Sequence, residues 1–173
     1  MKRFEDETDL LLFPPLRAAW GLRGQPLKVP LSGRNARRVI FGTINIDTGP
    51  RLFLARKRQR GEDFRAFLPL VASPYRGGHV AWVLDEDSSP TGQDSRALAE
   101  QLGMKLLWLP KRCPELTGLD PLGGPGKDHR CATKQYATID GEAKRFIRSL
   151  NGLSNQEALR QAGILSEDFW LGV

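Results

Sequence analysis

The spacing of apolar residues changes at Gly61, and this change restricts the folds open to the chain. Before it, residues 38–46 are rich in β-branched side chains and residues 51–56 are again extended, with the turn signal Asp47-Thr48-Gly49-Pro50 between them. The stretch 38–57 therefore predicts a β-hairpin, which gives the sheet an antiparallel start.

Helical spacing begins after Gly61, and helices and strands then alternate. The expected elements are a helix over 62–73 ended by Pro74, a buried strand over 79–84 leading into Asp85, a helix over 92–102 and a strand over 105–109. A strand, helix, strand order predicts a parallel crossover connection.

The two ends of the chain complete the expected architecture. Two short strands, 2–6 and 9–13, precede a stretch over 14–37 whose Pro and Gly residues predict a long loop. Helices are expected over 138–150 and over 155–162, the second opened by a capping box at Ser154. A hairpin followed by alternating helices and strands predicts an α/β fold: a ribonuclease H-like mixed sheet flanked by helices, in a single domain over 1–173.

Size and charge bound the class of protein. The 173 residues suit one domain, and a net charge of +6, from 26 basic and 20 acidic residues, favours a polyanionic partner, although a merely basic soluble protein would have the same balance. Because no apolar run could span a membrane and the N-terminus lacks a signal-peptide pattern, we expect a cytoplasmic protein without a membrane partner. Cys113 and Cys131 fit no usual zinc pattern, even with His129 nearby.

Three acidic residues carry the strongest chemical signal. They are Asp6, Asp85 and Asp120, with the 34 residues 86–119 between the last two. Each has an ordinary explanation on its own: a solvated strand residue, part of an acidic surface turn, and a helix cap. Together they are more informative, because an edge strand carrying Asp6, a central-strand tip carrying Asp85 and a later helix start would converge in a ribonuclease H-like sheet.

Converging carboxylates suit a two-metal site. Phosphodiester cleavage by that mechanism needs two Mg²⁺ or Mn²⁺ ions, about 3.5 to 4 Å apart, held by hard oxygen ligands. Without metal, clustered carboxylates repel one another and raise each other's pKa, which metal binding reverses. The acids therefore predict a site for divalent cations.

Five short motifs point to one family. They are residues 4–8, 34–46, 58–64, 83–85 and 107–116, the last reading Leu-Trp-Leu-Pro-Lys-Arg-Cys-Pro-Glu-Leu. In their order and spacing they resemble the catalytic domain of mariner-type DDE transposases of bacterial insertion sequences. The resemblance extends over nearly the whole chain.

The resemblance implies an activity and a set of site residues. Members of this family cut DNA at transposon ends with a metal-activated water, and then use the freed 3′-hydroxyl to attack target DNA. Asp6, Asp85 and Asp120 would be the metal ligands, and double-stranded DNA would be the partner. Basic residues that could contact the DNA backbone are Arg34, Arg37, Arg38, Arg56, Lys57, Arg58 and Arg60.

The sequence around Asp120 departs from the family pattern. Thr117 and Gly118 stand where the family has Asn and Pro, and Pro90 stands where it has a His. After Asp120 the family continues as a helix, but residues 123–126 read Gly-Gly-Pro-Gly. In a helix these four would cost about 6 kcal/mol, against a typical domain stability of about 5 to 15 kcal/mol. We therefore expect Asp120 on a loop or short broken helix, as a poor metal ligand that impairs activity.

The N-terminus bears on partners and on alternative functions. Related transposases carry an N-terminal helix-turn-helix region that reads the transposon end, and nothing before Phe4 could supply one. We expect a truncated catalytic half, with a separate helix-turn-helix half or a second copy in a homodimer as candidate partners. Two other functions stay open: a non-catalytic DNA-binding or interaction remnant of a transposase, and a ribonuclease H-like nuclease unrelated to transposition.

Overall fold

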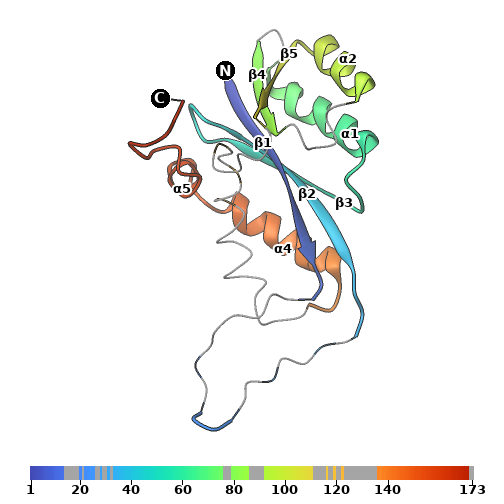
Figure 1. Cartoon of the computed structure of the whole chain (residues 1–173), viewed down its shortest axis with the longest axis vertical. Coiled ribbons are helices and arrows are strands. Elements are labelled where there is room, and N and C mark those ends of the chain that lie inside the picture. The colour runs from blue at the N-terminus through green and yellow to red at the C-terminus, as the bar shows by residue number, and fades with distance from the viewer. Residues whose placement is uncertain are drawn as a thin grey trace.

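The fold is built on a mixed five-stranded sheet, with strand order β3-β2-β1-β4-β5 (Figure 1). The computed structural model describes residues 1–13, 20, 22–25, 28, 31, 33–75, 79–85, 92–110, 116, 119, 122 and 136–171. The strands are β1 (Lys2–Leu11), β2 (Arg37–Asn45), β3 (Arg51–Arg56), β4 (Val80–Asp85) and β5 (Met104–Leu109). Half of the loop expected over 14–37 falls outside the described residues.

The hairpin predicted over 38–57 is confirmed. Strands β2 and β3 pair antiparallel from Val39 opposite Arg56 to Ile44 opposite Arg51. Gly49 in the connecting turn has φ 87°, and a Cβ there would come within 2.7 Å of Asn155. Glycine is therefore required at this turn for both its backbone conformation and its lack of a side chain.

The first strand differs from the expectation in two respects. It is continuous over Lys2–Leu11 rather than two short strands, and it lies at the centre of the sheet rather than at its edge. The polar run from Glu5 to Thr8 hides this strand in the sequence, because the apolar alternation lapses there. The β1 backbone nevertheless pairs with β2 without a break from Arg3 to Leu11, since ladder hydrogen bonds do not depend on side-chain polarity.

The parallel crossover is also confirmed. Helix α2 (Gln93–Gln101) joins β4 to β5, and these strands pair parallel from Val80 opposite Met104 to Asp85 opposite Leu109. Helix α1 (Gly61–Ala72) is followed by a 3-10 turn, η1 (Ser73–Tyr75), that contains the expected helix breaker Pro74.

Two helices follow in the last third of the chain. Helix α4 (Ile139–Asn151) begins after Thr138, whose side chain accepts a hydrogen bond from the Gly141 N–H. Helix α5 (Asn155–Gln161) opens with the predicted capping box between Ser154 and Glu157. None of the helices that the structure describes has the length and apolar character needed to cross a bilayer.

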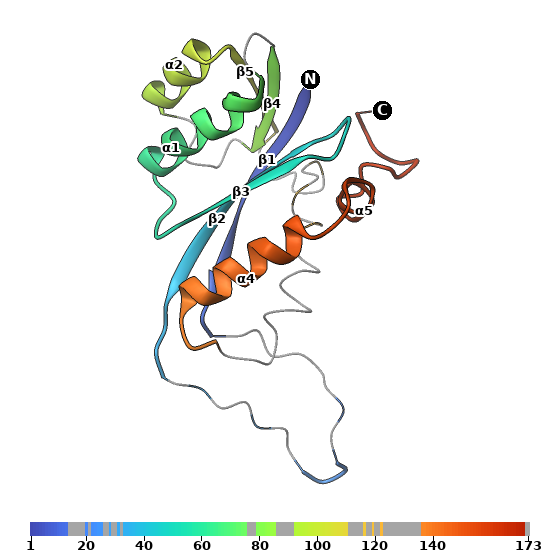
Figure 2. The same cartoon turned by 180° about the vertical axis from the view of Figure 1, so that it is seen from behind.

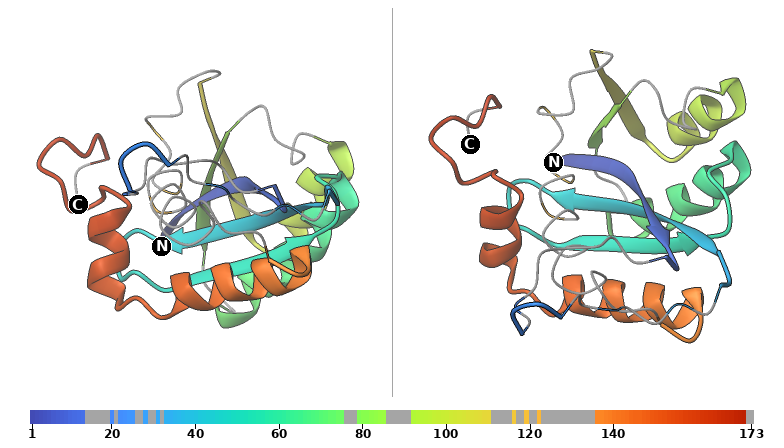
Figure 3. Two further views of the ribbon diagram at one scale, coloured as in Figure 1. Left: turned by 90° about the horizontal axis from the view of Figure 1, so that it is seen from below. Right: turned by 60° about the horizontal axis from the view of Figure 1, so that its bottom comes forward.

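The sheet separates two layers of helices (Figures 2 and 3). On one face, Phe146 and Leu150 of α4 pack on the β2 residues Ile40 and Ile44. On the other face, α1 packs on Phe41 and on neighbouring strand residues. Because alternate residues of β2 enter opposite cores, the two faces of the sheet are well defined, and the face covered by α4 is the one that concerns the site.

Candidate active site

The register between β1 and β4 brings the first two predicted acids to one level of the sheet. These parallel strands are last paired at Phe4 opposite Val83, and Asp6 and Asp85 each lie two residues further on. Since side chains alternate between faces, both acids lie on the same face as Phe4 and Val83, which belong to the core under α4. Asp6 and Asp85 are therefore half-buried carboxylates on neighbouring strands and on one face of the sheet.

Glu5, the residue before Asp6 in β1, is a buried carboxyl. Its side chain is 1% exposed, and within the described part of the chain neither of its carboxylate oxygens has a hydrogen-bond partner. Burial, first, and then the charges of Glu7, Asp6 and Asp85 raise the pKa of Glu5 well above its ordinary value. Both Asp6 and Asp85 thus lie close enough to Glu5 to act on it electrostatically.

A buried hydrogen-bond network fixes the strands just before these acids. The Oγ1 of Thr43 accepts hydrogen bonds from Arg3 Nε and from Trp82 Nε1, each with a donor–acceptor distance of 3.0 Å. It donates a hydrogen bond to the carbonyl oxygen of Phe4 at a distance of 2.7 Å. Arg3 also donates to the Tyr75 hydroxyl over 2.7 Å. Strands β1, β2 and β4 are thereby tied together by one hydroxyl, which limits how far Asp6 and Asp85 can move apart.

The third predicted acid, Asp120, lies outside the described residues. Its neighbours Leu119 and Leu122 are 6% and 0% exposed, and both belong to the core under α4. The carbonyl oxygen of Leu116 accepts a hydrogen bond from Trp170 Nε1 over 3.1 Å. The chain on both sides of position 120 is thus held against the face of the sheet that carries Asp6. The expectation of a loop or broken helix at Asp120 stays a prediction.

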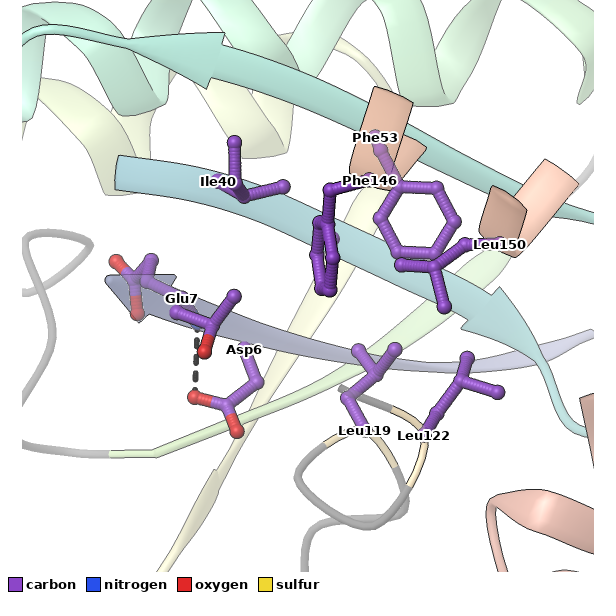
Figure 4. Close-up of a pocket in the computed structure, with 10 residues that line it drawn as sticks. Asp6, Glu7, Ile40, Phe53, Leu119, Leu122, Phe146 and Leu150 are labelled. Atoms are coloured by element: carbon purple, nitrogen blue, oxygen red, sulfur yellow. Dashed lines mark hydrogen bonds between the residues drawn. The ribbon is translucent and has the colours of Figure 1, made fainter. Parts of the chain in front are cut away.

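A small cavity lies between Asp6 and α4 (Figure 4). Its volume is about 20 Å³, enough for about one water molecule. In Figure 4, Asp6 lies between Glu7 and Leu119 and accepts a hydrogen bond from the Glu7 N–H over 2.8 Å. The lining residues are Asp6, Glu7, Thr8, Ile40, Gly42, Phe53, Leu119, Leu122, Phe146 and Leu150. The half-buried Asp6 thus lies at the edge of a cavity whose other walls are mostly apolar.

Most of the basic residues predicted to contact DNA are engaged with acids. Ion pairs join Arg37 to Asp9, Arg38 to Asp140, Arg56 to Asp63 and Arg60 to Glu62, at 2.8, 2.7, 3.5 and 3.4 Å. Arg34 is exposed just before β2, and Lys57 and Arg58 are exposed after β3. Lys57 and Arg58 have no ion-pair partner among the described residues, so they are the better candidates of the set for phosphate contacts.

The donor set fits a divalent cation. Asp6 and Asp85 supply hard carboxylate oxygens, which Mg²⁺ and Mn²⁺ prefer. Within the described ranges no group of three or more metal-binding side chains occurs, and Asp120 lies outside those ranges.

Some residues of the site carry no signal in the sequence. Glu5 reads as an exposed strand residue, and only the central position of β1 buries it. Nothing in the sequence around Thr43 indicates its role. Its hydroxyl joins three strands only because Arg3 and Trp82, which lie on other strands, donate hydrogen bonds to it. Trp170 follows the last predicted helix and has no periodic context. None of these could have been found without the tertiary pairing.

Comparisons with known proteins agree with this architecture. The DDE superfamily endonuclease family matches residues 2–124. The fold is similar to the Mos1 transposase paired-end complex with left transposon end, at TM-score 0.72 and 15% identity, covering 97% of this chain and 53% of that chain. It is similar to the mariner Mos1 paired end complex with Mg, at TM-score 0.73 and 14% identity, covering 93% and 51%. No curated protein matches the sequence.

The catalytic domain of Mos1 mariner transposase is also similar, at TM-score 0.65 and 12% identity, covering 93% of this chain and 74% of that chain. The chain spans about half the length of the Mos1 chains in the complexes. The predicted ribonuclease H-like mixed sheet is confirmed by these likenesses. With its family match over residues 2–124 and this fold, the chain belongs to the DDE superfamily endonucleases and has the architecture of a mariner transposase catalytic domain.

Proposed function

We propose that the chain cleaves DNA strands at transposon ends and transfers them to target DNA, as the catalytic domain of a DDE transposase that depends on divalent metal ions. The observation that carries this proposal is the position of Asp6 and Asp85, level with each other on neighbouring parallel strands and on one face of the sheet. The neighbours support it, since the Mos1 structures are described as complexes with a transposon end, with Mn and with Mg.

Asp6 and Asp85 would hold the ions, with Asp120 as third ligand. Two Mg²⁺ or Mn²⁺ ions, when bound, would supply Lewis-acid stabilisation of the attacking and leaving oxygens. The chain's own residues set the geometry, since the Thr43 hydroxyl ties β1 to β4 next to the two acids. Leu119 and Leu122, both in the core, would hold Asp120 near the other two acids.

The partner in this proposal is double-stranded DNA, both the transposon end and the target. Sequence-specific recognition of the end would come from a helix-turn-helix region on a separate chain, and two catalytic domains would pair as a homodimer to act on two ends. The protein would work in the cytoplasm, where bacterial DNA is accessible.

A second function is favoured by the sequence after Asp120. The run Gly-Gly-Pro-Gly at 123–126 and the substitutions Thr117 and Gly118 weaken the case for a competent third ligand. A remnant that binds DNA through its basic surface without cutting it would keep the fold and lose only the chemistry.

Plasmid nicking separates the two functions. The wild-type protein should nick supercoiled plasmid in Mg²⁺ and not in chelator. Asp6→Ala and Asp85→Ala should each lose at least about 100-fold in rate, because several kcal/mol of transition-state stabilisation would go. Asp9→Ala, an exposed acid on the same strand, is the matched control and should nick as wild type does. DNA binding without nicking by the wild-type protein would favour the remnant, and equal nicking by all variants would exclude this site.

A further inference from the structure

The outer face of α4 carries exposed cations that the sequence analysis assigned no role. Lys144, Arg145 and Arg148 are all exposed, and none of them has an ion-pair partner among the described residues. They lie on the side of α4 opposite Phe146 and Leu150, which pack on the sheet. Helical spacing explains the split, since residues three and four apart share a face.

A hollow runs along this face. Its volume is about 600 Å³, and its described lining consists of Gly141, Lys144, Arg145, Arg148 and Ser149. Lys144 to Arg148 spans one turn, about 6 Å along the helix axis. Each strand of duplex DNA carries one phosphate per about 3.4 Å of axis, so a stretch of this length presents about two phosphates of one strand to the three cations. The charges are complementary in sign.

The positive potential continues beyond the helix. At the N-terminal end of α4, the pKa of the exposed Asp140 is lowered by its hydrogen bond to Arg38 and by the charges of Arg38, Lys57 and Lys144. Three cations thus surround one acid. The positive charge of the outer face of α4 thus continues to Lys57, which follows β3 and belongs to the basic run over 56–60.

The opposite layer of the molecule does not offer such a surface. Arg65 on α1 lies 3.8 Å from Asp94 on α2, and Arg96 lies over the Trp108 ring at 5.1 Å. Those cations already have partners, and α2 adds the exposed acids Asp94 and Glu100. The three neighbouring cations of α4 thus differ from those of the α1 and α2 layer, which have partners.

We propose that the α4 surface, defined as Lys144, Arg145 and Arg148, binds the backbone of duplex DNA outside the scissile phosphodiester. The inference rests on the proposed function for its substrate. Backbone contacts of this kind position DNA without reading its sequence. Binding energy at such a remote surface would hold the duplex on the protein while another part of it reaches Asp6 and Asp85.

The test is the affinity for a fluorescently labelled duplex of arbitrary sequence, measured by anisotropy over a range of salt concentrations in chelator. Lys144→Glu with Arg148→Glu should lower the affinity about 10-fold and reduce the slope of log affinity against log salt by about 2. The matched control is Lys105→Glu with Arg160→Glu, which changes the net charge equally at two exposed positions away from α4 and should leave affinity within about 2-fold of wild type.

The proposal would be overturned if the α4 variant kept the wild-type affinity for DNA, or if the α4 variant and the control variant lost affinity equally. It would also be overturned if the α4 variant lost binding to anionic lipid vesicles while its affinity for DNA stayed at the wild-type value. Because charge reversal could disturb the helix, Lys144→Gln with Arg148→Gln provides a milder variant, for which a reduced salt slope is again expected. Chelator removes metal chemistry from the assay. Failure of the proposed cleavage would therefore leave this result standing, and failure of the α4 surface would leave plasmid nicking to be judged separately.

Discussion

The indole Nε1 of Trp170 donates a hydrogen bond to the carbonyl oxygen of Leu116, with a donor–acceptor distance of 3.1 Å. Trp170 also packs beside Phe4, with ring centroids 6.2 Å apart. The residue therefore joins the C-terminal segment to the central strand and to the chain that leads into Asp120. We propose that this contact helps to position the third acid of the proposed site.

Trp170→Phe tests this role. The substitution keeps an aromatic ring against Phe4 and removes the hydrogen bond to Leu116, so the free energy of unfolding should fall by about 1 kcal/mol. The affinity for Mn²⁺ should fall as well, which a purely structural contact would not cause. The control is Trp20→Phe, because Trp20 is fully exposed. Wild-type Mn²⁺ affinity in Trp170→Phe would show that this hydrogen bond does not position the site.

Gly42→Ala should destabilise the protein by about 1 to 2 kcal/mol in denaturant unfolding. Gly42 is paired with Asp6 in the β1–β2 ladder, and a Cβ there would lie 3.0 Å from the Phe53 ring, which lines the cavity beside Asp6. The ring would have to shift. Gly152→Ala is the control, since a Cβ at that position meets only ordinary contacts from 3.4 Å outward. Equal stability of the two variants would mean that the ring moves without penalty.

The buried carboxyl of Glu5 should make stability depend on pH. Its pKa is raised in the folded state, so the folded protein holds a proton that the unfolded chain releases from about pH 4.3 upward. Stability should therefore fall as pH rises from that value towards the folded pKa. Glu5→Gln should remove this slope and unfold at a higher temperature than wild type at neutral pH. Glu100→Gln, an exposed control, should keep it. A wild-type slope in Glu5→Gln would contradict the assignment.

The pair between Arg38 and Asp140 should act in the opposite direction. Arg38 lowers the pKa of Asp140 through two hydrogen bonds, of 2.7 and 2.9 Å. The pair thus adds stability above the unfolded pKa of about 3.9, and this is lost as pH falls through the folded value. Asp140→Asn should lower the melting temperature slightly at neutral pH and not below pH 3. A deficit that persists at low pH would indicate a role in helix capping instead.

Much of the fold follows from local sequence patterns. The hairpin with its turn at Gly49, the crossover between β4 and β5, and the capping box at Ser154 are each encoded by residues close together in the chain. The central position of β1 is not, because it depends on β4 pairing with only Lys2 to Phe4 on the far side of the strand. A strand with acids in its middle looks like an edge strand until its neighbours are known.

The candidate site was predictable in its residue types and not in its surroundings. The sequence pointed to Asp6 and Asp85, and the register places them level with each other. It did not reveal that Glu5, the residue before Asp6, is buried, since burial of that carboxyl depends on the central position of β1. Exposed cations were predicted from their density along the chain, which missed Lys144 and Arg148 because helical spacing spreads them out.

The binding of Mn²⁺, followed by electron paramagnetic resonance during titration, tests the central claim most directly. Wild-type protein should bind the ion, Asp6→Asn and Asp85→Asn should each weaken binding at least about 10-fold, and Asp9→Asn should bind as wild type, since only the first two acids share one level and one face of the sheet. Equal Mn²⁺ affinity in all four proteins would contradict a metal site at Asp6 and Asp85.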